Sequence, residues 1–334
     1  MVRIAAADYT GPTARAWVIG ATGTYEDMKL ESVEVPTPGE GQLRVRVLRA
    51  STNPVDYKRC EFPSGFVAYP SSVGIDGAGI VEAIGDSVET GAKVGDRVAF
   101  FAGLSSGFGS FAEHALVDAT LAVPVPEGVS LDAAAALPTV ALTALIGLEK
   151  LQVEAGKTLL VTGGAGGVGQ FVIQMAVSQG VTVITTCSTG NVAALKVLGA
   201  HHVIDYTTEK IAERVAEITK GAGVAYLYDC VSAATLNEAA GSVQAHGKIL
   251  SIVGPVETDA SYFMRGLATF HVNLLIQPPA KLRANLTEII QLAADKKLVV
   301  PVTKTIKLEE VKAQLAEQAA GHVKGKVVVA VTEA

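Results

Sequence analysis

The sequence predicts an α/β protein with two domains: a β-rich domain in the N-terminal part, and a doubly wound parallel sheet with helices on both faces. Short strand patterns with few helices fill the N-terminal part, and strand and helix patterns alternate after it. The chain has 334 residues, which is long for a single domain. Hydrophobic residues make up 49% and charged residues 18%, so a large core can form and disorder is not expected.

The N-terminal domain is predicted from short strands separated by turn residues. Residues 43–50 alternate between apolar side chains and arginines, which is typical of a strand with one buried face. Other strands are expected at residues 16–19, 28–35, 79–84, 95–100 and 110–117. Residues 53–56 are interpreted as a turn or the start of a helix, and residues 103–109 as a loop. Many short strands at this spacing predict a barrel-like domain.

The second domain is predicted from its alternation of strands and helices. A long alanine- and leucine-rich helix is expected over residues 131–151. Strands are then expected at residues 158–162, 181–186, 202–204, 225–229 and 248–253, with helices at 168–179, 191–198, 209–219 and 233–244. A sixth strand is expected at 268–276. The remaining elements are a helix at 280–296, a strand at 301–306, a helix at 308–318 and a strand at 326–331.

The turn after the first strand of the second domain has a sequence that suits a pyrophosphate. Its residues are Gly164-Ala165-Gly166-Gly167-Val168-Gly169, which match G-x-G-x-x-G. Glycines let a phosphate approach the backbone, and the N–H groups and dipole of the following helix attract the anion. A tight turn without a ligand is the alternative, but the apolar strand before it and the apolar helix after it favour a nucleotide site.

Charge and cysteine content argue against several classes of protein. The net charge is −6 and there is no basic stripe, so no nucleic acid and no membrane surface is expected as a partner. Cys60, Cys187 and Cys230 are scattered, which argues against a disulfide scaffold or a four-cysteine zinc site. The sequence shows no signal peptide and no run of about eighteen apolar residues. We therefore expect a cytoplasmic globular protein.

Several short segments, in this order, resemble the medium-chain dehydrogenase/reductase superfamily in its zinc-independent quinone oxidoreductase-like branch. The segments are Asn53-Pro54-Val55-Asp56, Gly74-Ile75-Asp76-Gly77-Ala78-Gly79, Gly109-Ser110-Phe111-Ala112-Glu113, Leu137-Pro138, residues 163–169, Val203-Ile204-Asp205-Tyr206 and Gly325-Lys326-Val327-Val328. The resemblance implies a GroES-like β-rich catalytic domain at residues 1–126 and 270–334, and a Rossmann dinucleotide-binding domain at 127–269. It also implies a nicotinamide cofactor bound between them.

The same resemblance implies that no metal is bound. Zinc-containing members have a cysteine ligand where this chain has Asn53, and Gly-His-Glu where it has Gly74-Ile75-Asp76. They also carry a cysteine-rich lobe that is missing here. A catalytic zinc needs about three nitrogen, sulfur or carboxylate ligands, and Asp76 alone does not supply them.

The cofactor is expected to be NADPH, with NADH as the alternative. NAD-specific folds of this kind carry an acidic residue about twenty residues after the glycine motif, and residues 184–189 contain none. Ser188 and Thr189 can donate hydrogen bonds to a 2′-phosphate. Many NADPH-dependent relatives have a lysine or arginine next, but this chain has Gly190-Asn191-Val192. Tyr206 matches a family tyrosine at the adenosine end; a half-buried tyrosine at a strand end is the alternative.

The other cofactor residues are assigned by the resemblance. Thr143 matches a cofactor-site threonine, and a threonine that packs the helix is the alternative. The segments expected to border the nicotinamide contain Val253, Gly254 and Asn273. Asp56 is interpreted as fixing its loop or the cofactor, and Lys326 as a cofactor contact.

Asn53 and Tyr57 are the expected catalytic residues. Without zinc, a hydrogen-bond donor must polarise the substrate oxygen, and Asn53 is the first choice; a turn residue before Pro54 is the alternative. Tyr57 could supply a proton, although many relatives place their tyrosine a few residues later, where this chain has Phe62.

These assignments imply an NADPH-dependent reductase of quinones, enones, enals or related carbonyl compounds. Two alternatives stay open: a ketone reductase or alcohol dehydrogenase, and a non-catalytic NADPH-binding structural or regulatory protein. The apolar strand expected at 268–276 would be an exposed sheet edge unless paired, so a homodimer joined at this edge is expected. The pocket loops near residues 62–69, 101–108 and 271–279 carry no readable code for the substrate.

Overall fold

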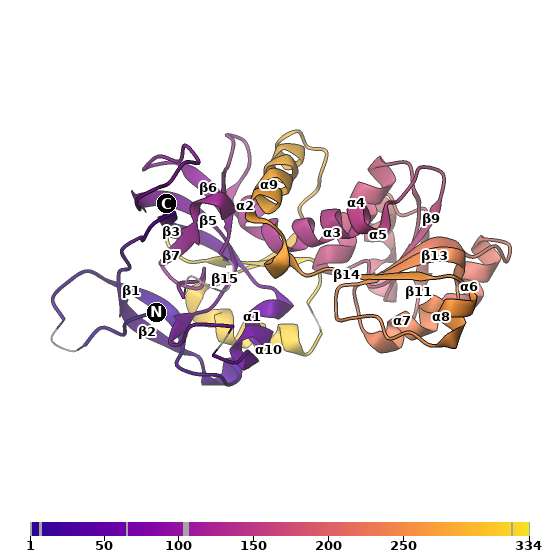
Figure 1. The fold of residues 1–334 in the computed structure, drawn as a ribbon, viewed down its shortest axis with the longest axis horizontal. Coiled ribbons are helices and arrows are strands. Elements are labelled where there is room, and N and C mark those ends of the chain that lie inside the picture. Colours follow the sequence, from indigo (N-terminus) through magenta and orange to yellow (C-terminus); the bar gives the residue numbers. More distant parts are fainter. Residues whose placement is uncertain (1, 7–8, 65, 103–106, 322, 334) are drawn as a thin grey trace. The chain divides into compact units, whose positions relative to one another are not determined.

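A computed structural model describes residues 2–6, 9–64, 66–102, 107–321 and 323–333 of the chain. The chain forms two compact units (Figure 1): the first comprises residues 1–139 and 275–334, and the second residues 140–274. The expected boundaries were 126/127 and 269/270, and those of the units are 139/140 and 274/275. The expected loops at residues 62–69, 101–108 and 103–109 lie partly outside the described residues.

The first unit is rich in β structure, as expected. Its larger sheet has the order β15-β16-β3-β5-β6-β8, and β7 pairs with β3. The strands are β3 (Gln42–Ser51), β5 (Asp76–Ile84), β6 (Arg97–Phe101), β7 (His114–Asp118), β8 (Ala122–Pro124), β15 (Val302–Lys307) and β16 (Lys326–Ala330). The smaller sheet consists of β2 (Lys29–Glu34), β1 (Thr13–Ile19) and β4 (Ser71–Ser72) in that order.

Helices and 3-10 turns accompany these sheets. The α-helices of the first unit are α1 (Pro54–Lys58), α2 (Leu131–Ala136), α9 (Pro279–Ala294) and α10 (Val311–Ala319). Its 3-10 turns are η1 (Tyr25–Asp27), η2 (Arg59–Glu61), η3 (Ala119–Leu121), η5 (Leu274–Ile276), which begins on the last residue of the second unit, and η6 (Leu308–Glu310).

The end of β3 is where three distant parts of the chain meet. Ser51 is in register with Asp76, the first residue of β5. On its other side, Ser51 is in register with Val328 of β16. The sheet therefore brings residue 53, residue 76 and the start of β16 together, although they are far apart in the sequence.

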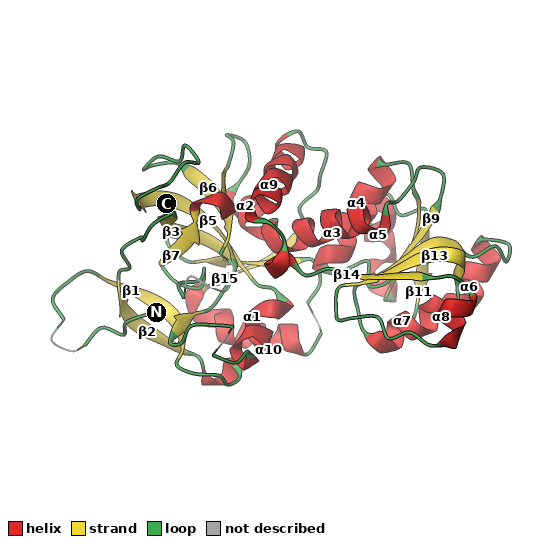
Figure 2. Ribbon diagram, viewed as in Figure 1, coloured by secondary structure: helices red, strands yellow, loops and turns green. Residues whose placement is uncertain are grey.

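The second unit contains the predicted doubly wound parallel sheet, in the order β11-β10-β9-β12-β13-β14. Its strands are β9 (Thr158–Val161), β10 (Thr182–Cys187), β11 (His202–Asp205), β12 (Val224–Asp229), β13 (Val243–Ser251) and β14 (Ala268–His271). Its helices are α3 (Pro138–Leu151), which starts at the unit boundary, α4 (Gly167–Ser178), α5 (Val192–Val197), α6 (Ile211–Ile218), α7 (Ala233–Ala240) and α8 (Ala260–Met264), and η4 (Thr189–Asn191) is a 3-10 turn. In Figure 2, α4 and α5 lie on one side of the sheet and α7 and α8 on the other.

Several expected elements differ from the structure, and four of the differences are informative. The helix expected over 131–151 is two helices, because Pro138 lacks a backbone N–H and starts α3 anew. The helix expected to reach 244 ends at Ala240, since Val243 already pairs with Val224 of β12. The strand expected over 268–276 ends at His271, with a 3-10 turn at Leu274–Ile276. The strand expected from residue 110 begins at His114.

Apolar residues fill the space between sheet and helices in each unit. In the second unit, Leu160, Ile184 and Leu227 of the sheet belong to one buried cluster with Val215 of α6 and Leu236 of α7. Over the described stretches of the chain, none of the helices is long and apolar enough to cross a membrane.

Candidate functional site

The first part of the site is the start of α1 in the first unit. Asn53 precedes the helix and Pro54 occupies its first turn, where a missing N–H costs nothing. Asp56 Oδ2 accepts a hydrogen bond of 2.7 Å from the backbone N–H of Asn53. This bond closes the first turn and holds residues 53–56 in one conformation.

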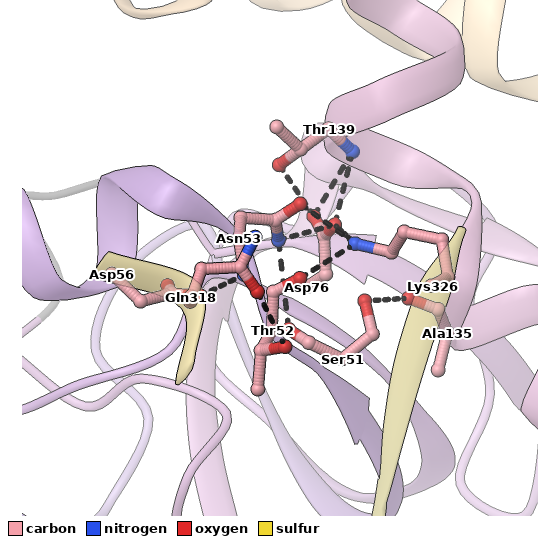
Figure 3. Close-up of polar contacts among 9 residues, drawn as sticks. All are labelled: Ser51, Thr52, Asn53, Asp56, Asp76, Ala135, Thr139, Gln318 and Lys326. Carbon is pink, nitrogen blue, oxygen red and sulfur yellow. Dashed lines mark hydrogen bonds and ion pairs between the residues drawn. The ribbon is translucent and has the colours of Figure 1, made fainter. Parts of the chain in front are cut away.

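Lys326, the first residue of β16, connects this turn to the sheet. Its ammonium group donates to Asn53 Oδ1 at 2.7 Å and to the Thr52 carbonyl oxygen at 3.0 Å. Asp76 Oδ2 lies 3.8 Å from the same nitrogen. Figure 3 shows Lys326 reaching into the space between Asn53, Thr52 and Asp76. Lys326 is only 2% exposed, so its charge is balanced inside the unit.

The amide group of Asn53 has a fixed orientation in this network. Lys326 can only donate, so it faces Oδ1, while Nδ2 donates to Asp76 Oδ2 at 2.9 Å. A longer contact of 3.5 Å joins Nδ2 to the Ser51 carbonyl oxygen. Asn53 is 1% exposed. Its expected role as donor to the substrate stays a prediction, and it requires that one of these contacts be given up.

Asp76 is the centre of the network. Its Oδ1 accepts from the Thr139 hydroxyl at 2.7 Å and from the Thr139 backbone N–H at 3.0 Å. Burial raises the pKa of Asp76, and the Lys326 charge and the bonds from Thr139 and Asn53 oppose that rise. For Lys326, burial lowers the pKa and the two aspartates oppose the change. The charges of the Asp76 carboxylate and the Lys326 ammonium group therefore balance each other in a site that is buried from water.

Asp56 is less well satisfied than Asp76. Burial raises the pKa of Asp56 to about 7, against the opposing effects of the Asn53 N–H and of Lys326 and Arg59. Its Oδ1 is buried and has no hydrogen-bond partner among the described residues. The same is true of Nε of Arg59, which is 2% exposed. Asp56 is thus a carboxyl group that titrates near neutral pH.

Tyr57 lies on α1 but outside this network. Its ring meets the ring of Tyr25 edge-on, with 6.3 Å between the ring centres. Burial raises the pKa of its hydroxyl, with Glu61 adding to the effect. The structure therefore brings Asn53, Asp56 and Lys326 together and leaves Tyr57 beside them.

The donor set around Asn53 is not that of a metal site. It consists of an amide, a carboxylate and an ammonium group, and zinc prefers thiolates and imidazoles with a few carboxylates. Within the part of the chain that is described, no three histidine, cysteine, aspartate or glutamate side chains gather to hold a metal ion. The absence of zinc itself stays a prediction.

In the second unit, the glycine turn joins β9 to α4 and has the shape expected for a phosphate. Gly163 has a φ of +67°, and a Cβ at Gly164 would lie 2.1 Å from Thr185 Oγ1. A Cβ at Gly169 would lie 2.4 Å from the Gly163 carbonyl oxygen. Gly166 is the N-cap residue of α4 and offers no side-chain cap, so the N–H groups of the first turn, Gly167, Val168 and Gly169, have no side-chain partner from it. These residues fit a nucleotide pyrophosphate.

The predicted adenosine end follows β10 and β11. Ser188 Oγ accepts a bond of 3.0 Å from Asn191 Nδ2. Thr189 Oγ1 lies 3.0 Å from Thr207 Oγ1, which bonds to Asp205 at 2.6 Å. Tyr206 follows β11 and is 56% exposed, which leaves its ring accessible.

Four more of the predicted cofactor residues lie in the second unit, whereas Asp56 and Lys326 lie in the first. Val253 and Gly254 line a cavity of about 190 Å³ together with Ser232, Leu236, Ser251 and Pro255. Thr143 of α3 is 8% exposed, and its carbonyl oxygen accepts from Tyr228 at 2.7 Å. Asn273 lies two residues after β14.

Sequence reasoning overlooked some of these residues. Asp76 was weighed only as a zinc ligand, and Thr139 and Thr52 were not considered. Asp205 was quoted in a motif without a role, because it follows a different strand from Ser188 and Thr189. The pairing of Asn53 with Lys326 spans 273 positions, and nothing in the sequence spacing indicates it.

Family models match two parts of the chain. The model described as alcohol dehydrogenase GroES-like domain matches residues 39–127. The model described as zinc-binding dehydrogenase matches residues 198–329.

Individual relatives are similar over longer stretches. A quinone oxidoreductase of Pseudomonas aeruginosa is 35% identical over 71% of this chain and 73% of its own length. A 2-methylene-furan-3-one reductase of Solanum lycopersicum is 40% identical, and an NADPH-dependent alkenal/one oxidoreductase of Arabidopsis thaliana 38%, each over 60% of this chain. The chain spans about half the length of these two plant relatives, 54% in each case.

Solved structures share the fold. An alcohol dehydrogenase superfamily protein from Novosphingobium aromaticivorans has a TM-score of 0.86 at 28% identity, covering 96% of this chain and all of that one. A mycobacterial protein in complex with NADPH has a TM-score of 0.84 at 28% identity, covering 95% of this chain and 99% of that one. The chain belongs to the medium-chain dehydrogenase/reductase superfamily, in its quinone oxidoreductase-like branch.

Proposed function

We propose that the protein is an NADPH-dependent reductase that acts without zinc on quinones, enones, enals or related carbonyl compounds, with NADH as an alternative cofactor. The observation that carries the proposal is the buried network in which Lys326 bonds to Asn53 beside Asp76. The resemblance to the superfamily implies that its zinc-containing members have metal ligands at the positions of Asn53 and of the segment around Asp76. Here an amide and a carboxylate share a lysine cation instead.

The second unit supplies the residues that would hold the cofactor. Gly166 and the first turn of α4 present a pyrophosphate site with no side-chain cap in the way. The absence of an acid in residues 184–189 and the hydroxyl of Ser188 favour NADPH. A relative and a solved structure whose names include NADPH support the same choice.

The chemistry of the first unit limits which substrates suit the protein. A bound nicotinamide supplies a hydride. The chain must then stabilise the negative charge that reduction leaves on the substrate, and no metal centre is available to do this in the proposed mechanism. Quinones and enones spread that charge over several atoms, so one hydrogen bond and a proton from solvent are sufficient. An unactivated ketone concentrates the charge on one oxygen and requires a stronger donor.

The test is oxidation of NADPH by the purified protein with matched quinones, enals, enones and saturated ketones. We expect turnover with quinones, enals and enones and at least tenfold lower kcat/KM with saturated ketones, about 1.4 kcal/mol in the barrier. Turnover of ketones alone would identify a ketone reductase instead. NADPH binding without any turnover would indicate a non-catalytic protein.

Zinc is tested on the same preparation. Elemental analysis and activity after dialysis against a chelator should give less than stoichiometric zinc and unchanged turnover. Stoichiometric zinc that is lost together with activity would overturn the zinc-independent mechanism.

The proposal includes the cellular compartment of the protein. Among the described residues, Cys60, Cys187 and Cys230 form no disulfide, which suits a reducing compartment such as the cytoplasm.

A further inference from the structure

The ends of β10 and β11 lie side by side in the second unit. Cys187, the last residue of β10, is in register with Asp205, the last residue of β11. In folds of this kind, the strand after the glycine turn and its helix ends beside the adenosine ribose. That strand is β10, so the groups that follow it and those that follow β11 decide whether a 2′-hydroxyl or a 2′-phosphate fits.

Asp205 anchors a short chain of hydroxyl groups at this place. Its Oδ1 accepts from the Thr207 backbone N–H at 3.0 Å and from the Thr207 hydroxyl at 2.6 Å. The Thr207 hydroxyl in turn lies 3.0 Å from the Thr189 hydroxyl. Bonds from Thr189 and Thr207 lower the pKa of Asp205, so the carboxylate is charged at neutral pH.

The directions of these bonds follow from the chemistry of the groups. A carboxylate can only accept, so the single hydroxyl proton of Thr207 is donated to Asp205. The proton of Thr189 is then also used inside this group, toward Thr207 or toward the carboxylate itself. Thr189 consequently presents only oxygen lone pairs to a ligand. A lone pair accepts a bond from a ribose 2′-hydroxyl, but it repels the oxygens of a phosphate.

Ser188 behaves differently from Thr189. Its Oγ accepts from Asn191 Nδ2 at 3.0 Å, so its own proton can be donated to either a hydroxyl or a phosphate oxygen. The end of β10 therefore offers one hydrogen-bond donor, Ser188, and one acceptor, Thr189, which suits binding of both NADPH and NADH.

We propose that Asp205, acting through Thr207 and Thr189, is a specificity-determining residue that makes the adenosine site accept the ribose 2′-hydroxyl and so narrows the preference for NADPH over NADH. The inference rests on the proposed function, because it concerns the cofactor of the same enzyme. It assigns to β11 the acidic residue that the sequence after β10 lacks.

Asp205→Asn is the direct test, since asparagine keeps the oxygen that accepts from Thr207 and removes the charge. The dissociation constants of NADPH, NADH, 2′,5′-ADP and 5′-AMP are measured by isothermal titration calorimetry on the full chain. In the variant, NADPH and 2′,5′-ADP should bind about tenfold more tightly, because the negative charge behind Thr207 and Thr189 is removed. NADH and 5′-AMP should change by less than about twofold, because they carry no 2′-phosphate.

Asp259→Asn is the matched control. Asp259 Oδ1 accepts from the Ser261 N–H at 2.8 Å and from the Ser261 hydroxyl at 2.6 Å, which is the local arrangement of Asp205. It precedes α8 and β14, and β14 lies at the opposite edge of the sheet from β11. This variant removes the same charge and should leave all four dissociation constants unchanged.

A measurement on the unaltered protein needs no variant. Raising the ionic strength screens a repulsion, so the affinity for 2′,5′-ADP should rise relative to that for 5′-AMP. The opposite trend would indicate recognition of the phosphate by a cation and would overturn the inference.

The outcomes separate the inference from the proposed function. If NADPH and NADH bind but their ratio is the same in the unaltered protein and in Asp205→Asn, the inference is wrong and the reductase assignment stands. If neither nucleotide binds, both are wrong. If Asp205→Asn and Asp259→Asn change the dissociation constants equally, the effect comes from the net charge of the protein and not from Asp205. That result would also overturn the inference.

Discussion

Asp56 is a buried carboxyl group whose protonation is linked to the stability of the first unit. Its pKa is raised to about 7, whereas an aspartate in an unfolded chain titrates near 3.9. Between these values the folded chain binds more protons than the unfolded chain, so the free energy of unfolding falls as the pH rises. The contribution is fully present below about pH 4 and is lost as the pH rises through about 7.

Asp56→Asn should flatten this dependence, because asparagine still accepts from the Asn53 N–H but does not ionise. From pH 5 to pH 8, the free energy of unfolding of the variant should rise relative to the unaltered protein by about 2 kcal/mol. Urea unfolding followed by the fluorescence of Trp17 measures it, since Trp17 is the single tryptophan and donates to the Leu308 carbonyl oxygen at 2.7 Å within the first unit. Parallel curves at all pH values would refute the prediction.

Asp27→Asn is the control for Asp56. Asp27 Oδ2 accepts from the Thr24 N–H at 2.8 Å at the start of η1, which is the arrangement of Asp56 at α1, but Asp27 is exposed. A pH-dependent difference of the same size in both variants would assign the effect to the loss of any capping carboxylate rather than to burial.

Lys326 and Asp76 should be strongly coupled in stability. Lys326→Met leaves a buried carboxylate without its cation, which costs about 3–5 kcal/mol. Combining it with Asp76→Asn removes that charge, so the double variant should lose at least about 1 kcal/mol less than the sum of the single losses. Lys304→Met is the control, because Lys304 pairs with the exposed Glu317 and should cost about 0–1 kcal/mol. Additive losses in the double variant would show that the two groups act independently.

Asn53 and Tyr57 are distinguished by turnover. Asn53→Ala should lower kcat about tenfold to a hundredfold, as expected for loss of one donor, with little change in the dissociation constant of NADPH. Tyr57→Phe should be milder, since phenylalanine keeps the ring contact with Tyr25. Steady-state kinetics on the best quinone or enone tests both. A collapse with Tyr57→Phe and normal turnover with Asn53→Ala would make the tyrosine the acid.

At the scale of elements, the turn between β9 and α4 contains a glycine, Gly166, that ligand binding is expected to require but that the backbone conformation does not. A Cβ at Gly166 would have only the Gly163 carbonyl oxygen within 4 Å among the described residues, at 3.3 Å, and φ is −74° there. Alanine is therefore compatible with the backbone at this position. The added methyl would occupy the space through which a phosphate approaches the helix N-terminus.

Gly166→Ala should weaken NADPH binding by at least about tenfold while changing the free energy of unfolding by less than about 1 kcal/mol. Gly241→Ala is the control: φ is −58° there and a Cβ would meet nothing within 4 Å among the described residues. Calorimetric titration and thermal unfolding measure the two effects. Unchanged NADPH affinity in Gly166→Ala would mean that the turn does not hold the pyrophosphate.

The elements that the sequence predicts well are those defined by neighbouring residues. The glycine turn, its strand and its helix follow from contacts within a few positions, as does the start of α1 at Pro54. The end of α7 does not, because β13 begins at Val243 to pair with Val224, and pairing partners are not visible in a local pattern. Pro138 indicates the helix break at Leu137, but the apolar periodicity on both sides of it favours one continuous helix.

The candidate site shows the same division. The Asn53–Asp56 bond joins residues three positions apart, and the sequence marks both. The contacts of Lys326 with Asn53 and Asp76 depend on the pairing of β3 with both β5 and β16. Asp205 lies beside Thr189 only because β11 pairs with β10. Local sequence patterns identify the residues of a single turn, whereas the other residues of the site can be identified only from the order of the strands in the sheet.

At the scale of the whole molecule, β14 is the element that points to self-association. It stands at the end of the sheet order of the second unit, next to β13. An edge strand offers unpaired N–H and C=O groups, which in solution pair with another strand or are covered. In the preceding helix α8, Phe263 is 87% exposed and Met264 is 80% exposed. Exposed apolar residues therefore precede β14 by only a few positions in the sequence. A second copy of the chain would supply both a strand and an apolar partner.

We therefore expect a homodimer joined at β14, with a mass in solution of twice the 34.4 kDa of one chain. Phe270→Lys should shift the protein toward monomer at micromolar concentration, because a lysine on an edge strand disfavours pairing with another strand. Val203→Lys is the control on β11, at the opposite edge of the sheet. Light scattering after gel filtration measures the mass. A monomer in the unaltered protein, or equal effects of the two variants, would show that β14 is not the dimer edge.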